Sequence, residues 1–129
     1  MTRGNQAVAI NAACDEEDGD RPVDLVHLAK YTMGNRELER EVLTLFTKQS
    51  LIYLDRLRNA ADKQTWCEAA HTLKGSARGI GAWQVADVAA SLEHLSGKNA
   101  GGEKTSLVEA LCDSIDAANG FIESLLTEQ

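Results

Sequence analysis

The chain has 129 residues, 43% of them hydrophobic, which is enough for one domain with a single buried core. Asp and Glu total 20 against 13 Lys and Arg, and a net charge of -7 repels a phosphate backbone, so nucleic acid is not expected as a partner. One proline and 5% aromatic residues disfavour a β-sandwich, and we expect an all-α fold.

No stretch approaches the roughly 20 apolar residues that span a bilayer, and residues 1–13 lack the basic start and apolar run of a signal peptide. We therefore expect a cytoplasmic protein without a membrane partner. Cys14, Cys67 and Cys112 are far apart and form no CxxC pair, so reduced thiols are predicted and no metal site. The starting Met1 and a long leading segment favour an independent protein over a piece of a hybrid kinase.

The first elements are an acidic tail and a short helix. Residues 1–21 show no periodicity and end in an acidic run, which predicts a disordered tail before a domain at 22–129. Asp24 is placed to cap a helix that closes at Gly34, with apolar positions at Leu25, Leu28 and Tyr31.

A long second helix is predicted from Asn35, its cap, to about Ala60. Its apolar residues recur at spacings of three, four or seven: Leu38, Val42, Leu45, Phe46, Ile52, Tyr53 and Leu57. Asp62 or Thr65 begins the third helix, and the segment from Thr65 to Glu68 has the S/T-x-x-E form of a capping box.

Gly79 and Gly81 interrupt the third helix and predict a turn. The fourth helix has an inner face made of Val85, Val88, Ala89, Leu92 and Leu95. After a flexible connection at 97–102, a fifth helix ends near Leu126, with apolar positions at Leu107, Leu111, Ile115, Ala118, Ile122 and Leu125. Such amphipathic helices bury their apolar faces most simply in an antiparallel bundle, with the short first helix as a lid.

The third helix presents a histidine. At 100° per residue its apolar positions fall in one stripe, formed by Trp66, Ala69, Ala70, Leu73, Ala77 and Ile80. His71 lies on the opposite side, followed at i+3, i+4 and i+7 by Lys74, Gly75 and Arg78. His27 and His94 have no comparable surroundings. We therefore expect the imidazole of His71 to be exposed to a macromolecular partner.

The segment from Ala70 to Ala77 (AHTLKGSA), followed by Gly81, resembles the histidine phosphotransfer (HPt) domain of multistep two-component phosphorelays. The resemblance extends from Val23 to about Ser96, and the last helix agrees in type only. It implies an antiparallel up-down four-helix bundle with a short extra N-terminal helix.

The resemblance also implies roles for single residues. His71 would accept a phosphoryl group from the aspartyl phosphate of a receiver domain, and Lys74 would bind phosphoryl oxygens. Gly75 would leave room for the partner's loops, because it lacks a side chain beside the imidazole. Glu93, at the family's usual Glu or Gln position, would accept a hydrogen bond from the ring and hold its tautomer.

Further binding residues are expected around this centre: Arg78, which would steer acidic surface, together with Cys67 and Glu68. Cys67 lies one turn before His71, so a nucleophilic Cys-His pair is an alternative, although the middle of a helix supplies no oxyanion hole.

The implied partners are the receiver domains of a hybrid histidine kinase and of a response regulator, with the protein itself a monomer. No cofactor is expected in this chain, because the Mg²⁺ needed for transfer belongs to the receiver. The chain has no ATP-binding motif, so autonomous kinase activity is not expected. The alternative function is a binding module that docks a receiver or helical partner through the same face without moving phosphate. A metal-binding bundle would need inward His, Asp or Glu residues at i, i+3 spacing, which these helices do not offer.

Overall fold

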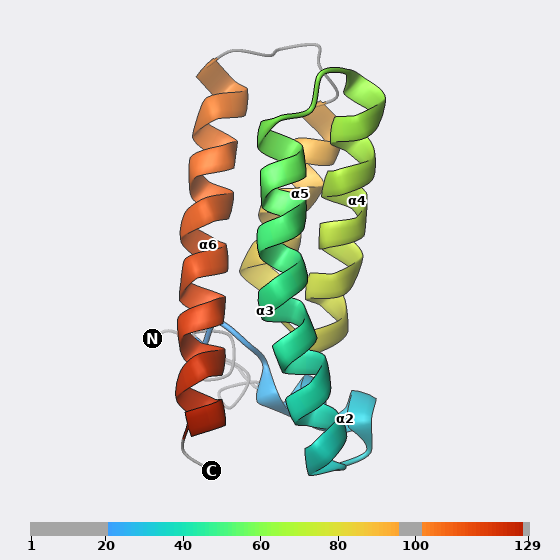
Figure 1. Cartoon of the computed structure of the whole chain (residues 1–129), viewed down its shortest axis with the longest axis vertical. Coiled ribbons are helices and arrows are strands. Elements are labelled where there is room, and N and C mark those ends of the chain that lie inside the picture. The colour runs from blue at the N-terminus through green and yellow to red at the C-terminus, as the bar shows by residue number, and fades with distance from the viewer. Residues whose placement is uncertain (1–20, 96–101, 128–129) are drawn as a thin grey trace, which may run out of the picture.

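The computed structural model describes residues 21–95 and 102–127 of the chain. These residues form five helices and no strand: α2 (Leu25–Thr32), α3 (Arg36–Arg58), α4 (Lys63–Ile80), α5 (Trp83–Leu95) and α6 (Gly102–Thr127) (Figure 1). The acidic tail predicted at 1–21, with Cys14, lies outside the described residues except for Arg21. The connection predicted at 97–102 lies outside them except for Gly102, which begins α6.

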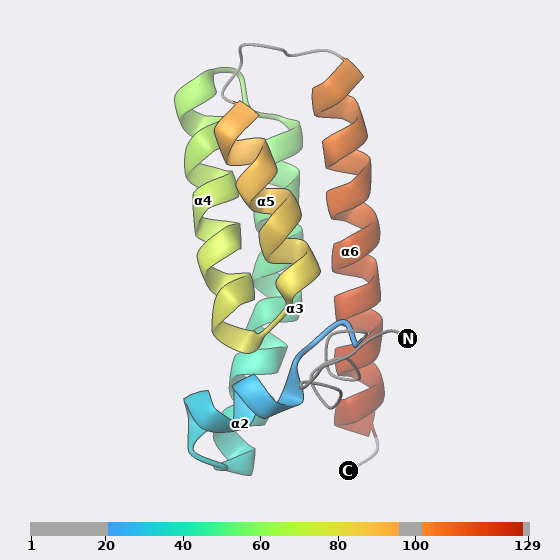
Figure 2. The same cartoon turned by 180° about the vertical axis from the view of Figure 1, so that it is seen from behind.

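The four long helices form an antiparallel bundle. Helix α3 packs against α4 and α6, and α5 packs against the same two helices from the other side (Figures 1 and 2). Helix α2 contacts α3 and α4 at the end of the bundle where α4 leads into α5. The predicted all-α, up-down bundle with a short extra N-terminal helix is confirmed.

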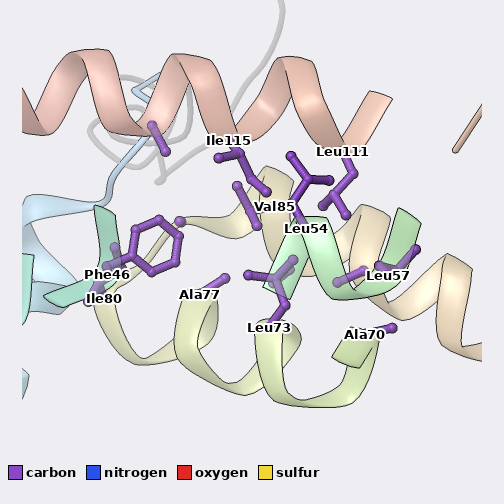
Figure 3. Packing of buried hydrophobic residues seen from close by; sticks show 14 of the residues in the cluster. Phe46, Leu54, Leu57, Ala70, Leu73, Ala77, Ile80, Val85, Leu111 and Ile115 are labelled. Atoms are coloured by element: carbon purple, nitrogen blue, oxygen red, sulfur yellow. The ribbon is translucent and has the colours of Figure 1, made fainter. Parts of the chain in front are cut away.

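All four long helices contribute to one hydrophobic core. Leu73 and Ala77 of α4 point toward Leu54, Val85 and Ile115 of the other three helices (Figure 3). Each large aliphatic side chain removed from water stabilises the fold by roughly 1.5–3 kcal/mol. The buried residues of α4 are the six of the predicted stripe, so the inward face of this helix follows from the sequence alone.

The predicted apolar faces of α2 and α3 are partly wrong. Tyr31, Leu38, Leu45 and Ile52, which the sequence analysis placed inward, are exposed. The buried residues of α3 are Leu43, Phe46, Ser50, Leu54 and Leu57. Apolar residues occupy two sides of α3, and only one side can face the bundle, so periodicity alone does not select it.

Helices α2, α3 and α4 each begin after a residue whose side-chain oxygen accepts a hydrogen bond from a backbone N–H of the first turn. Asp24 and Asn35 cap α2 and α3 as predicted, and Asp62 caps α4 by accepting a hydrogen bond of 2.8 Å from the backbone N–H of Thr65. The capping box at Thr65 to Glu68 is therefore wrong, because Lys63 and Gln64 already continue the helix toward Asp62. Glu68 instead accepts a hydrogen bond from the Gln64 side chain.

Helix α2 is fastened to the turn between α4 and α5 by four residues, here called the α2 anchor: Asp24, His27, Gly81 and Trp83. The backbone N–H of Asp24 donates to the carbonyl of Gly81 at 2.9 Å, and the Trp83 indole donates to the Asp24 carboxylate at 3.0 Å. The His27 ring meets the Trp83 ring edge-on, with centroids 4.8 Å apart. Gly81 ends α4 at φ +81°, and a Cβ there would lie 2.8 Å from the Asp24 Cβ, so only glycine fits.

Candidate functional site

His71 lies in the middle of α4 on the side that faces away from the core. Its side chain is 68% exposed, whereas its neighbours Ala70 and Leu73 are buried. The exposed imidazole predicted from helix periodicity is therefore present in the structure, and a second protein can reach it.

A single carboxylate from the neighbouring helix α5 joins two residues of α4. Glu93 Oε2 lies 2.9 Å from His71 Nδ1, and Glu93 Oε1 accepts a hydrogen bond of 2.7 Å from Lys74 Nζ. The two oxygens are thus divided between the imidazole and the ammonium, which lie one helical turn apart on α4. We call these three residues the histidine cluster.

The charge of Glu93 favours one tautomer of the His71 ring. The hydrogen bond from Lys74 holds the pKa of the Glu93 carboxyl below its usual value; partial burial opposes this, and the His71 hydrogen bond reinforces it. An ionised carboxylate only accepts hydrogen bonds, so a neutral imidazole that is bonded to it carries its hydrogen on Nδ1. In that tautomer the lone pair is on Nε2.

Lys74 is less exposed than its place on the helix suggests. The sequence analysis placed it on the outward face with His71, but its side chain is only 16% exposed and is paired with Glu93. The two residues are 19 positions apart and belong to different helices. The pairing depends on how α4 and α5 are aligned, which no local sequence signal gives.

Gly75 lies beside the histidine cluster and borders open space. A Cβ built at Gly75 would meet no heavy atom within 4 Å. Gly75, Ser76 and Gly79 of α4 line a surface groove whose other wall comes from α2 and α3, with Tyr31, Val42, Leu45, Phe46, Gln49 and Ile80 as the remaining lining residues. We call it the Gly75 groove. The exposed Tyr31 and Leu45, misassigned to the core from sequence, are part of this surface.

The other three predicted site residues lie around the histidine cluster. The Cys67 thiol donates to the backbone carbonyl of Glu93 at 3.8 Å, so its hydrogen-bond partner belongs to α5 and is not the His71 ring. This geometry gives no support to a nucleophilic Cys-His pair. Glu68 and Arg78 are exposed on α4, before and after His71.

No helix among the described residues is long and apolar enough to cross a membrane. Within residues 21–95 and 102–127, no group of three or more His, Cys, Asp and Glu side chains is arranged to hold a metal ion.

Comparisons with known proteins agree with the geometry. The sequence model of the Hpt domain family matches residues 41–121, and the match includes most of α6, which the sequence resemblance had left out. The structure is similar to the crystal structure of histidine phosphotransferase ShpA from Caulobacter crescentus, with a TM-score of 0.66 and 29% identity over 84% of this chain and 93% of that one. A comparison with curated proteins gives no significant match.

Proposed function

Because this chain belongs to the Hpt domain family, with its general role in histidine phosphotransfer between receiver domains, we propose that His71 is the phosphoryl-accepting residue. The donor would be the aspartyl phosphate of a hybrid-kinase receiver domain, and the acceptor the receiver domain of a response regulator. The observation that supports this most is the exposed imidazole whose Nδ1 is bound to the ionised carboxylate of Glu93.

The transfer is an in-line displacement at phosphorus. The Nε2 lone pair of His71 forms the N–P bond while the O–P bond to the receiver aspartate breaks, and that aspartate leaves as a carboxylate. The hydrogen on Nδ1 stays, so the ring becomes positively charged while bound to Glu93. Passing the group to the second receiver reverses these steps. Alignment and nearby cations stabilise the loose transition state of such reactions, so the protein needs to supply little covalent chemistry.

Two cations are proposed to act on the phosphoryl oxygens. Lys74 lies one turn from His71, and its ammonium has three donors, so it can neutralise charge on a phosphoryl oxygen while it stays paired with Glu93. In this proposal the second cation is the Mg²⁺ ion of the receiver domain, and this chain contributes no metal ligand.

The Gly75 groove is proposed as the surface on which the receiver docks. It combines exposed apolar side chains with the space left by Gly75, directly beside the histidine cluster. Arg78, Cys67 and Glu68 would border the contact. Removing such apolar surface from water stabilises a complex, and the absence of a side chain at Gly75 allows a close backbone approach.

Label transfer from a phosphorylated receiver domain tests the proposal. Wild-type protein is expected to take up label in an acid-labile, base-stable linkage, and His71→Gln is expected to take up none. His94→Gln is the matched control, because His94 is also exposed but lies outside the histidine cluster. A labelled His71→Gln protein would exclude His71 as the acceptor. A wild-type protein that binds the receiver and stays unlabelled would favour the binding-module alternative.

A further inference from the structure

The divided carboxylate of Glu93 has a consequence for the phosphorylated protein. In the unphosphorylated state its negative charge is matched by Lys74 Nζ at 2.7 Å, while His71 Nδ1 lies 2.9 Å from the other oxygen and, in the Nδ1–H tautomer, donates a hydrogen bond to it. The ion pair is partly shielded from water, because the side chains of Lys74 and Glu93 are 16% and 24% exposed. An ion pair with restricted solvent access is screened less by salt and water than a fully exposed one.

Phosphorylation changes the charge on one side of Glu93. With phosphorus on Nε2 and hydrogen on Nδ1, the ring is cationic, so Glu93 Oε2 then accepts a charge-assisted hydrogen bond in place of a neutral one. Such bonds are roughly twice as strong. Glu93 therefore favours the protonated form of the phosphorylated ring over the deprotonated form.

The protonation state of the ring controls how readily the N–P bond breaks. From the protonated form the leaving group is a neutral imidazole, whereas from the deprotonated form it is an imidazolate anion, which leaves far more slowly. We propose that Glu93 is a positioning residue whose charge limits the lifetime of the phosphoryl group on His71, and that Lys74 moderates this effect by sharing the carboxylate. This inference rests on the proposed function of His71.

Two substitutions are expected to change the lifetime in opposite directions. Glu93→Gln keeps an oxygen that can accept from Nδ1 but removes the charge, so the phosphorylated protein lasts longer, by at least about threefold. Lys74→Gln removes the ammonium that shares the Glu93 carboxylate. The carboxylate then stabilises the protonated ring more strongly, and the lifetime of the phosphoryl group shortens. A loss of general packing would not produce effects of opposite sign at two partners of one ion pair.

The experiment measures loss of label from phosphorylated protein after the donor receiver has been removed, with each variant's fold checked by circular dichroism. Asp87→Asn is the matched control, because it removes one exposed negative charge from the same helix and is expected to leave the lifetime unchanged. In parallel, ¹⁵N NMR of the phosphorylated ring is expected to show a protonated Nδ1 in the wild type and a smaller protonated fraction in Glu93→Gln.

The outcomes separate the two proposals. If Glu93→Gln loses label as fast as the wild type, or if Asp87→Asn lengthens the lifetime equally, the role of Glu93 is overturned while His71 remains the acceptor. If the wild type takes no label on His71, the proposed function falls and this inference falls with it.

Discussion

The histidine cluster and the α2 anchor contain the same residue types in different arrangements. Each combines a histidine with a carboxylate, and each joins two helices. In the anchor, the Asp24 carboxylate accepts hydrogen bonds from the His27 backbone and the Trp83 indole, and the His27 ring lies against Trp83. In the histidine cluster, the carboxylate engages the imidazole itself and leaves that ring 68% exposed. The two regions therefore differ in whether a carboxylate holds one nitrogen of an exposed imidazole, which is the arrangement that the proposed phosphoryl transfer needs.

The α2 anchor contains a glycine and the histidine cluster lies beside one, and the two glycines are there for different physical reasons. Gly81 is required by its left-handed backbone and by the closeness of Asp24, whereas Gly75 is helical and borders open space. Substitutions at the two positions are expected to separate stability from transfer.

The largest expected effect is on the anchor. Gly81→Ala places a methyl group 2.8 Å from the Asp24 Cβ on a backbone that disfavours it, and should lower the free energy of unfolding by about 2–4 kcal/mol. Urea denaturation measures this loss. Gly79→Ala is the matched control; it adds a methyl group in open space within the same helix and should stabilise by up to about 1 kcal/mol. Equal stability of the two variants would show that the anchor does not hold α2.

The second effect concerns Gly75, which lies beside the histidine cluster. Gly75→Gln should have a urea midpoint of unfolding at least as high as that of the wild type, because glycine is a poor helix former. Transfer from a phosphorylated receiver should nevertheless slow by at least about tenfold. The physical reason is the bulk that it places beside His71, where the partner must approach. Gly75→Ala adds far less bulk and should slow transfer less. Normal transfer kinetics in Gly75→Gln would refute the role assigned to this open space.

The smallest effect concerns pH. Burial alone would raise the pKa of Asp24, but hydrogen bonds from Trp83 and from the His27 backbone, with the charge interaction of His27, lower it below its usual value. A lowered carboxyl pKa stabilises the fold above the unfolded-state pKa of about 3.9 and loses that contribution as pH falls through the native value.

Asp24→Asn should therefore cost about 1 kcal/mol near pH 7, and less as the pH falls below about 4. Thermal unfolding of both proteins from pH 7 to pH 2.5 checks this. A difference that stays constant over that range would mean that the Asp24 charge contributes nothing to the anchor.

The sequence predicted the inward face of α4 completely and that of α3 poorly. On α4, small and large apolar residues form one stripe, so the opposite side, with His71, is the only candidate for exposure. On α3, Leu45 and Ile52 are as apolar as Leu43 and Leu54, and the choice between them depends on where α4 and α6 lie. Local periodicity determines a face only when a helix has a single apolar side.

The candidate site shows the same division. The position of Glu93 opposite the imidazole was predicted through the family resemblance, and the hydrogen bond is present. The ion pair between Lys74 and Glu93 was not predicted, because it requires the alignment of two helices. The Gly75 groove, proposed as the docking surface, was not predicted for a related reason: Tyr31 and Leu45 were assigned to the core on hydrophobicity alone.

The central claim is that Glu93 holds the hydrogen of His71 Nδ1, so that Nε2 takes the phosphoryl group. Two-dimensional ¹H–¹⁵N NMR of the imidazole, combined with ³¹P–¹⁵N coupling after phosphorylation by a receiver domain, measures this directly. We predict an Nδ1–H tautomer before phosphorylation and phosphorus coupled to Nε2 of His71 afterwards. Phosphorus on Nδ1, or on any other residue, would contradict the account.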